Sequence, residues 1–276
     1  MRASSPAVEP AEPQAPRAET AARGSVPPPD AMIHLEQLTM SYDGRVVLDG
    51  IGLSIPRSKI SVVMGGSGHG KSTILKLIVG FMPPDSGQIF IDGRDVLELS
   101  APERMEVQKT IGMSFQYSAL FDSMTVYENV AFPLREHTRL GEREIGDRVR
   151  EMLQRLSLPG IEDTMPSELS GGMKKRVGVA RAIMLQPKIM LFDEPESGLD
   201  PITTTSIGEL IMEMRDEFGI TCLVISHNLQ NTMHIGDRIS MLYKGQIIAT
   251  GSAEELKENP DPILQQFLHG ESQGPY

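Results

Sequence analysis

Residues 65–72 have the composition of a phosphate-binding loop. They read Gly-Gly-Ser-Gly-His-Gly-Lys-Ser, which fits the pattern G-x-x-x-x-G-K-[ST]. The loop follows a strand-like run at residues 59–64 and precedes a helical pattern at residues 72–79. Glycines let main-chain N–H groups close around phosphate oxygens, and the start of a helix adds a favourable potential for anions. The motif and its context predict a site for the phosphates of a nucleotide.

Individual residues of this phosphate loop have distinct expected roles. Lys71 would neutralise phosphate oxygens, Ser72 would offer its hydroxyl to Mg²⁺, and Thr73 would reach the α-phosphate. A glycine-rich turn that binds nothing is the alternative, and the Lys-Ser ending and the flanking elements disfavour it. The residues expected to contact nucleotide here are Gly65, Gly66, Ser67, Gly68, His69, Gly70, Lys71, Ser72 and Thr73.

Two adjacent acids follow an apolar strand pattern at residues 188–192. Asp193 and Glu194 would lie at the carboxyl edge of a parallel sheet, where open α/β folds bind their ligands. Asp193 would hold Mg²⁺ through its water shell, and Glu194 would orient and deprotonate an attacking water. Seen alone, the pair could be a solvated acidic end of a core strand. Together with the phosphate loop it indicates a hydrolytic site.

A second anion site is predicted at residues 169–173, which read Leu-Ser-Gly-Gly-Met. They precede a basic helical pattern at residues 174–185. Ser170 and the N–H groups of Gly171 and Gly172 would cap the start of that helix. An ordinary helix cap is the alternative for this segment taken alone.

The elements that position these residues alternate between strand and helix. Further β-rich runs occupy residues 32–40, 46–48, 53–55, 88–91, 110–115, 189–192 and 220–226, with a hairpin near residue 244. The pattern predicts an α/β fold with a mainly parallel sheet and an antiparallel β section on the N-terminal side. Residues 116–186 read as a helical insertion, in which Thr125 and Glu128 fit a capping box and Ile145, Val149, Met152, Leu153 and Leu156 have helical spacing.

Length and composition limit the remaining possibilities. The chain has 276 residues, enough for one main domain with a smaller appended part, and lacks a run of about 20 apolar residues that could cross a bilayer. The net charge of −11 disfavours a nucleic-acid partner. Cys222 lies in an apolar run and is expected to be a buried thiol in a reducing compartment. Residues 1–30, rich in Ala and Pro, are expected to be a disordered tail, with a partner-binding arm as the alternative.

The order of these segments resembles the signature set of ABC-type ATPases over about residues 33–250. The resemblance implies a P-loop NTPase domain at residues 31–252, with a helical subdomain at about 117–186. Residues 253–276 would be a tail that could contact the partner subunit. It also implies ATP and Mg²⁺ as ligands and a homodimer in which the phosphate loop of one subunit and the signature segment (residues 169–173) of the other enclose each ATP.

Further roles are carried over from the family to matching positions. Tyr42 resembles the aromatic residue that stacks on adenine, and Gln116 the residue that senses Mg²⁺ and water. Asp200 ends a segment, residues 197–200, that resembles the D-loop crossing the dimer interface, and His227 resembles the switch histidine that contacts the γ-phosphate. The implied catalytic residues are therefore Glu194, His227 and Gln116, and the implied metal-site residues are Ser72, Gln116 and Asp193.

Some positions depart from the commonest family pattern. Met173 stands where Gln is usual, Gly66 where Pro is usual, and Glu196 where a small or neutral residue is frequent. Because main-chain N–H groups do most of the anion binding in the signature segment, the loss of one Gln amide should tune affinity without abolishing it. We therefore still expect hydrolysis.

Four segments resemble more narrowly the Mla-type ATPases of bacterial lipid-trafficking systems: residues 130–138, 165–173, 200–203 and 259–270. This resemblance implies an integral-membrane permease and MCE-domain lipid-binding proteins as partners, and leaves open a small STAS-domain regulator. The chain would lie on the cytoplasmic face of the inner membrane, held there by the permease. Residues 116–134, with aromatic side chains, are the expected dock for a helix of that permease, with an ordinary core role for those aromatic side chains as the alternative.

Three other functions compete with this interpretation. An ATPase of an importer for amino acids or other small solutes would share the chemistry, and the segments at 130–138 and 259–270 disfavour it. A DNA-associated head domain of the same superfamily would carry long coiled coils between Lys71 and Ser170, where this chain has only 99 positions. A scaffold without hydrolysis should lack a base at Glu194, and the acid is present.

Overall fold

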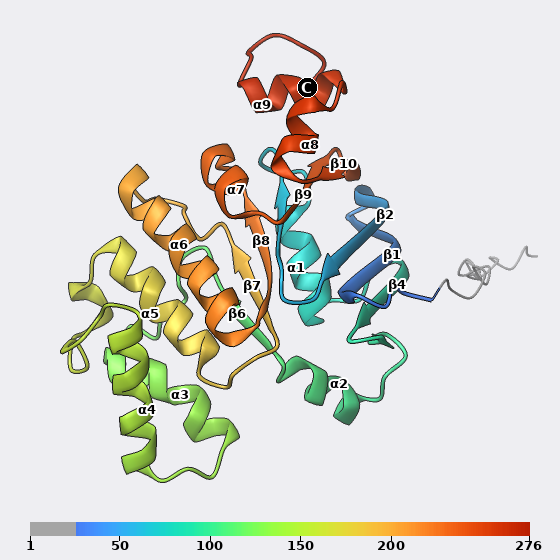
Figure 1. Cartoon of the computed structure of the whole chain (residues 1–276). Coiled ribbons are helices and arrows are strands. Elements are labelled where there is room, and N and C mark those ends of the chain that lie inside the picture. The colour runs from blue at the N-terminus through green and yellow to red at the C-terminus, as the bar shows by residue number, and fades with distance from the viewer. Residues whose placement is uncertain (1–25) are drawn as a thin grey trace, which may run out of the picture.

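A six-stranded sheet forms the centre of the molecule in the computed structural model, which describes residues 26–276 (Figure 1). Its inner strands run parallel, and only β10 at one edge is antiparallel to its neighbour. Every residue of β3 and β8 is buried, as expected for a parallel sheet covered on both faces. In spatial order the strands are β10 (Gln246–Gly251), β9 (Arg238–Tyr243), β3 (Ile60–Met64), β8 (Thr221–Ser226), β7 (Ile189–Asp193) and β6 (Ile111–Ser114).

A second, antiparallel sheet is formed mostly by the N-terminal part of the chain. Its strands are, in spatial order, β2 (Arg45–Pro56), β1 (Ala31–Tyr42), β4 (Ser86–Ile91) and β5 (Arg94–Asp95). The prediction of two separate strands at residues 46–48 and 53–55 was wrong, because β2 is continuous. Gly50 has a φ of 57°, and the pairing with β1 shifts register nearby, so an irregularity absorbs the turn residues without ending the strand. The predicted α/β class with an antiparallel section is confirmed.

Helices cover both faces of the central sheet. The helices are α1 (Lys71–Val79), α2 (Ala101–Gln108), α3 (Val126–His137), α4 (Glu142–Arg155), α5 (Gly171–Ile183), α6 (Pro201–Phe218), α7 (Leu229–Ile235), α8 (Ala253–Glu258) and α9 (Pro262–His269), with a 3₁₀ turn η1 (Pro166–Glu168). Within residues 26–276, no helix combines the length and the apolar character that a bilayer span requires.

Alternate residues of the central strands face two separate hydrophobic cores. On β8, Leu223 and Ile225 join the core that contains α1 and the antiparallel sheet, whereas Cys222 and Val224 join the core beneath α3 to α7. Helix α1 is thereby fixed between the two sheets. Because α1 follows the phosphate loop directly, this double packing also fixes where the loop lies.

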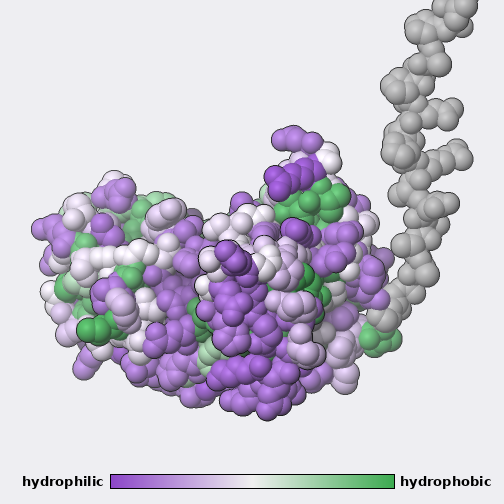
Figure 2. Space-filling view, turned by 90° about the horizontal axis from the view of Figure 1, so that it is seen from above, coloured by the Kyte–Doolittle hydropathy of each residue, from purple (hydrophilic) through white to green (hydrophobic). Residues whose placement is uncertain are grey.

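The predicted helical insertion contains α3, α4, η1 and α5. The Thr125 hydroxyl accepts a hydrogen bond from the Glu128 main chain (3.2 Å), and the Glu128 carboxylate accepts one from the Thr125 main chain (2.8 Å), which confirms the predicted capping box. Figure 1 shows α3 and α4 as a lobe beside the sheet. In Figure 2, which views the molecule from above, a notch in the outline separates the left-hand part of the molecule from the remainder. The face in Figure 2 is mostly hydrophilic, with apolar residues in small separate groups. Most of the expected N-terminal tail lies outside the described residues.

The buried thiol of Cys222 gives a test of this core. Its side chain is fully buried in β8, and burial raises its pKa to about 12. A raised pKa means that folding favours the protonated thiol. The stability that this protonated thiol contributes is therefore fully present below the pKa of the unfolded chain, about 8.5. It is lost as the pH rises through the pKa of the folded chain.

We expect iodoacetamide at pH 8 to label Cys222 slowly in the native chain and quickly in urea, as measured by intact-protein mass spectrometry. Cys222→Ala is the blank, because this is the only cysteine in the chain. Equal labelling rates in the native and unfolded chains would contradict the structure.

Candidate active site

The phosphate loop joins β3 to α1 and leaves the start of that helix open. Gly70 is the N-cap of α1 with a φ of 100°, and a Cβ at this position would lie 2.9 Å from the Val47 carbonyl oxygen. Glycine is therefore required there. The N-cap makes no side-chain hydrogen bond and the first turn carries no acid, so the first N–H groups of α1 have neither a side-chain cap nor an acidic neighbour in that turn. This is the arrangement that binds a phosphate.

Lys71 is the first residue of α1, directly after this loop, and is almost fully buried, at 5% exposure. Its ammonium donates hydrogen bonds to the carbonyls of Gly65 (2.9 Å) and Gly66 (3.0 Å), and lies 3.7 Å from Glu194 Oε1. Burial lowers the pKa of Lys71, and the charge of Glu194 acts in the opposite direction. The cation is thus held by the loop and by the carboxylate that sequence analysis predicted to act as the base.

Ser72 and Asp193 meet at the carboxyl end of β7. The Ser72 hydroxyl donates a 2.8 Å hydrogen bond to Asp193 Oδ1. Burial raises the pKa of Asp193, and the bond from Ser72 opposes that rise. Residues that are 121 positions apart therefore form the hydroxyl–carboxylate pair that was predicted as a metal site.

The Glu194 carboxylate is surrounded by groups from several parts of the chain. Gln116 Nε2 donates a 3.1 Å hydrogen bond to Oε2, and His227 Nδ1 lies 3.4 Å from the same oxygen. With Lys71 beside Oε1, the carboxylate has a donor or a cation near each oxygen. A carboxylate so placed next to a phosphate loop can accept a proton from a water that attacks a phosphoryl group.

The main chain of Glu194 adopts a conformation that is rare for a residue other than glycine. Its φ is 46°, in the left-handed region, which costs on the order of 1–3 kcal/mol unless neighbours hold it. Its N–H donates to the Ile225 carbonyl on β8 (2.9 Å), and its carbonyl accepts from the Ser197 N–H (3.0 Å). The turn after β7 thus directs the carboxylate toward Gln116 and His227.

A buried asparagine anchors the loop that begins at Gln116. Asn129 on α3 is fully buried, and its amide donates to the carbonyls of Phe121, Met124 and Thr125 at 3.0–3.1 Å. Its side-chain oxygen accepts from the Phe121 N–H at 2.8 Å. Each polar atom of this amide is therefore satisfied by loop backbone, which fixes the path of residues 121–125.

The signature segment lies apart from the phosphate loop of its own chain. Ser170 Oγ accepts a 3.3 Å hydrogen bond from the Met173 N–H and so caps α5. A Cβ at Gly172 would lie 2.7 Å from Thr203 on α6, so this position is closely packed. In the described residues the contacts of Ser170 and Gly172 are with the start of α5 and of α6. The structure does not bring them to Lys71.

Two other predicted residues also make local contacts. Asp200 caps α6: one carboxylate oxygen accepts from the N–H groups of Ile202 and Thr203 at 3.0 Å, and the other accepts from the Thr203 hydroxyl at 2.5 Å. The bond from the Thr203 hydroxyl, followed by those from the main chain, holds the pKa of Asp200 below the usual range. Tyr42 lies at the end of the β1–β2 hairpin, 38% exposed, with its hydroxyl donating to the Met82 sulfur at 3.0 Å. The predicted contacts of Asp200 and Tyr42 with nucleotide stay predictions.

Some residues that contact the site were not predicted from the sequence. Tyr276, the last residue, lies against the phosphate loop: its hydroxyl accepts a hydrogen bond from the Gly66 main chain, and its ring packs beside His69 at 5.7 Å. Lys175 contacts the main chain of Glu194. Glu196 was noted as unusual, and its buried carboxylate accepts a 2.6 Å bond from Ser226. No pattern marked Tyr276 or Lys175, because their contacts depend on chain folding.

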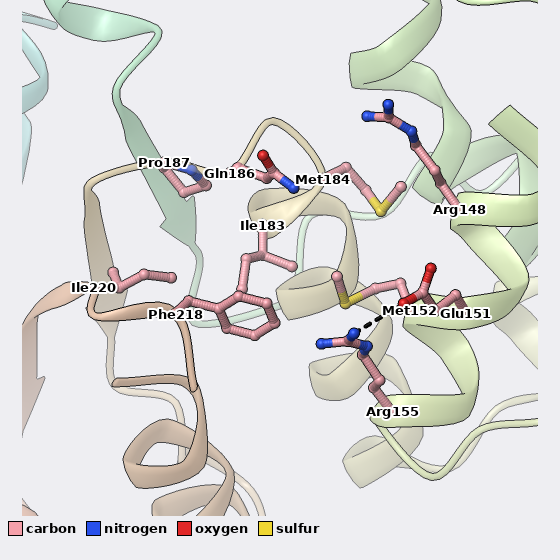
Figure 3. Close-up of a pocket in the computed structure, with 10 residues that line it drawn as sticks. All are labelled: Arg148, Glu151, Met152, Arg155, Ile183, Met184, Gln186, Pro187, Phe218 and Ile220. Atoms are coloured by element: carbon pink, nitrogen blue, oxygen red, sulfur yellow. Dashed lines mark hydrogen bonds and ion pairs between the residues drawn. The ribbon is translucent and has the colours of Figure 1, made fainter. Parts of the chain in front are cut away.

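A cavity of about 420 Å³ lies between α4, the end of α5 and the turn after α6 (Figure 3). Its rim carries Arg155, which bonds Glu151 at 2.8 Å and also pairs with Glu217. Since both partners are acids, this cation is already neutralised. The cavity lies at the junction of the helical lobe with the sheet, and none of the predicted site residues lines it.

Known proteins are similar to this chain over most of its length. The family model described as "ABC transporter" matches residues 48–197. The chain is 42% identical, over 88% of its own length and 91% of the relative's, to the intermembrane phospholipid transport system ATP-binding protein MlaF of Escherichia coli K12. It is also 42% identical to the probable ribonucleotide transport ATP-binding protein mkl of Mycobacterium leprae, over 90% of this chain and 72% of that one.

Solved structures share the fold. The chain superposes on cbiO1 from Clostridium perfringens, part of the ABC transporter complex cbiONQ, with a TM-score of 0.77, 32% identity, and coverage of 87% of this chain and 95% of that one. A dimeric ATP-binding cassette in a post-hydrolysis state with ADP and Pi gives a TM-score of 0.74 at 30% identity, covering 80% of this chain and 99% of that one.

The buried Asn129 amide generates a test of how the Gln116 loop is held. Asn129→Leu removes the amide, so the Phe121 N–H and the Met124 carbonyl lose the partner that this buried side chain supplies. We expect the free energy of unfolding in urea to fall by about 2–4 kcal/mol, because each orphaned buried group costs about 1–3 kcal/mol. The exposed Glu136 on the same helix provides the control, Glu136→Ala, which should change stability by less than about 0.5 kcal/mol. Equal stability of the two variants would refute the anchoring role.

Proposed function

Because the chain belongs to the ABC transporter family of ATP-binding proteins, we propose that it is the ATPase subunit of a phospholipid-transporting complex. Phospholipid is proposed as the cargo because the chain is 42% identical to an intermembrane phospholipid transport ATPase, over 91% of that relative's length. The subunit would act as a homodimer, held by an integral-membrane permease at the cytoplasmic face of the inner membrane. The geometry of the site supports ATP as the fuel.

The phosphate loop would hold the nucleotide. Main-chain N–H groups of residues 68–73 would surround the β- and γ-phosphates, and Tyr42 would stack on the adenine. In the present structure Lys71 pairs with Glu194 and with loop carbonyls. On binding, the ammonium would turn to phosphate oxygens, which frees the Glu194 carboxylate to accept a proton.

Hydrolysis would use the groups that converge on Glu194. Its carboxylate would take a proton from a water held in line with the γ-phosphate. Gln116 and His227 already contact this carboxylate and would orient the water and the γ-phosphate. After the phosphate departs, the protonated Glu194 carboxyl would release this proton to solvent water.

The oxygen atoms beside the loop fit Mg²⁺. This ion prefers oxygen ligands and is usually bound by one or two carboxylates together with substrate phosphates. Ser72 and Asp193 supply such a hydroxyl and carboxylate, and the Gln116 amide oxygen would be a third ligand. In residues 26–276 there is no group of three His, Cys, Asp or Glu side chains that would hold a metal without a ligand's phosphates. When bound, Mg²⁺ would offset phosphate charge.

The signature segment supports a dimer. Ser170 caps the start of α5, and this helix end would bind an anion away from the chain's own phosphate loop. A second copy in a head-to-tail arrangement would bring Ser170, Gly171 and Gly172 onto its partner's nucleotide, with Asp200 near the interface. Met173 packs partly against the core and leaves the main-chain N–H groups in place.

A permease helix would dock on the loop that follows Gln116. Of the aromatic residues in the expected docking stretch, Tyr117 is 86% exposed and Phe121 is 40% exposed. Tyr127 instead lies partly buried against the core. The exposed part of the stretch is therefore narrower than the sequence indicated, and it lies directly beside Gln116. MCE-domain proteins, and a STAS-domain regulator where one is present, would complete the complex.

Changing Glu194 separates binding from hydrolysis. Glu194→Gln should bind ATP, accumulate a closed dimer and lower kcat by about 10²–10⁴-fold, because a general base contributes that much. Lys71→Ala should instead weaken ATP binding, by roughly 10- to 100-fold for the loss of a charged hydrogen bond. Isothermal titration and phosphate release would measure both effects.

The exposed Glu209 on α6 gives the matched control. Glu209→Gln should keep the parent kcat and affinity. Parent turnover in Glu194→Gln would remove Glu194 from the role of base.

The cargo is tested with the complete membrane complex. We expect phospholipids to co-purify with it, as identified by mass spectrometry, and ATP to drive transfer of labelled phospholipid between proteoliposomes and acceptor vesicles. The complex that carries Glu194→Gln should transfer none above background. Transport of a ribonucleotide or another polar solute without any lipid transfer would overturn the phospholipid assignment.

A further inference from the structure

Lys175 is a buried cation in the second turn of α5, the helix that begins at the signature segment. Its side chain is 5% exposed. Lysine is almost never buried to this degree without a partner. The adjacent Lys174 is partly exposed, so helix periodicity separates the two lysines of this basic segment. Burying an ammonium is unfavourable unless hydrogen-bond acceptors or negative charges surround it.

Both hydrogen-bond acceptors of Lys175 are main-chain carbonyls of residues in the active site. Its ammonium donates to the carbonyl of Gln116 and, at 3.5 Å, to the carbonyl of Glu194. The side chains of these two residues bond each other at 3.1 Å. Lys175 therefore joins the backbones of a pair whose side chains meet a few bonds away.

The same face of α5 holds the rest of the Gln116 loop. A Cβ at Gly178, three residues on, would lie 3.3 Å from Ser118, and Arg181 donates to the carbonyls of Ser118 (3.1 Å) and Ala119 (2.8 Å). These contacts fix the loop alone. Lys175 reaches both the loop and the end of β7.

The carbonyl of Glu194 is a sensitive place for such a contact. Its residue holds a φ of 46°, a conformation that persists only when surrounding contacts enforce it. The Ser197 N–H is the other donor to this carbonyl. Removing the ammonium would leave the peptide plane of Glu194 with one restraint fewer, and the direction of the carboxylate depends on that plane.

The surroundings of Lys175 favour its charged form in part. Burial lowers its pKa, and the charges of Glu196, Glu194 and Asp193 act to raise it. Glu196 is itself buried, with Ser226 donating to one carboxylate oxygen at 2.6 Å. These acids thus offset part of the cost of burying a cation whose direct partners are neutral carbonyls.

We propose that Lys175 is a positioning residue for hydrolysis, which ties the signature helix to the main chain of Gln116 and Glu194 in the same subunit. The inference rests on the proposed ATPase mechanism. In the proposed dimer the start of α5 contacts the nucleotide bound by the partner subunit. Through Lys175, the alignment of Gln116 and Glu194 in one active site would therefore depend on the position of a helix that contacts the nucleotide in the other active site. It acts through Glu194 and does not touch the substrate.

The first test compares Lys175→Met, which removes the ammonium and leaves an unbranched apolar side chain one atom shorter, with Lys175→Arg, which restores a donor. Both are made in the full chain, purified with its native membrane partners. Lys175→Met should lower kcat by about 10- to 100-fold, the cost of a misplaced catalytic group, with the Kd for a non-hydrolysable ATP analogue within about threefold of the parent. Lys175→Arg should recover most of the lost kcat.

Lys188→Met is the control for loss of a lysine charge. Lys188 is exposed and pairs with Asp92, away from the site. This variant should keep the parent kcat. Thermal unfolding of all variants is measured in parallel, so that kcat can be expressed per folded subunit.

A double mutant keeps the inference testable if Lys175→Met is unstable. Because Lys175 acts through Glu194, adding Lys175→Gln to Glu194→Gln should cause no further loss of kcat. Independent roles would instead give multiplied losses.

The outcomes separate the two proposals. An unchanged kcat in Lys175→Met, a loss that Arg does not rescue, a rise in Kd that equals the fall in kcat, or multiplied losses in the double mutant would each overturn the role of Lys175. If the parent chain itself did not hydrolyse ATP, or if Glu194→Gln kept full turnover, the proposed mechanism would fail first, and the positioning role with it.

Discussion

The Glu194 carboxylate is the point on which the active site depends. Its oxygens lie beside Lys71 from the phosphate loop, Gln116 from the loop after β6, and His227 from the loop after β8. A carboxylate at 16% exposure is costly unless cations and donors surround it, and here each comes from a different segment. The central parallel sheet makes this possible, because the carboxyl ends of its strands deliver these segments to one edge.

The backbone around this carboxylate is irregular, and main-chain acceptors stabilise it. Ser118, Ala119 and Glu194 all have positive φ, a conformation that residues other than glycine seldom adopt. Asn129 and Arg181 satisfy the carbonyls of the Gln116 loop, as Lys175 does at its start. An irregular loop can be partly buried only when its polar groups are bonded in this way.

The two helix starts that are proposed to bind nucleotide phosphates have different surroundings. The start of α1 is left open by Gly70 and flanked by Lys71, whereas the start of α5 is capped by Ser170 and packed on α6. Since each end satisfies only part of what a nucleoside triphosphate requires, a second copy is the natural source of the remainder. The C-terminal residue adds a contact of its own, because Tyr276 lies over the phosphate loop of the same chain.

The sequence alone determined the contiguous parts of the site and the class of fold. The Gly-rich loop ending in Lys71 and Ser72, and the acids Asp193 and Glu194 after an apolar strand, are legible because their chemistry resides in neighbouring residues. The β2 strand was misjudged, since a local irregularity at Gly50 looks like a turn until its pairing with β1 is known. Only the tertiary structure placed Lys175 on the Glu194 carbonyl, because that contact depends on how α5 packs against β6 and β7. A lysine in a basic helix gives no sign of being buried, and burial with main-chain acceptors is a property of the packed chain.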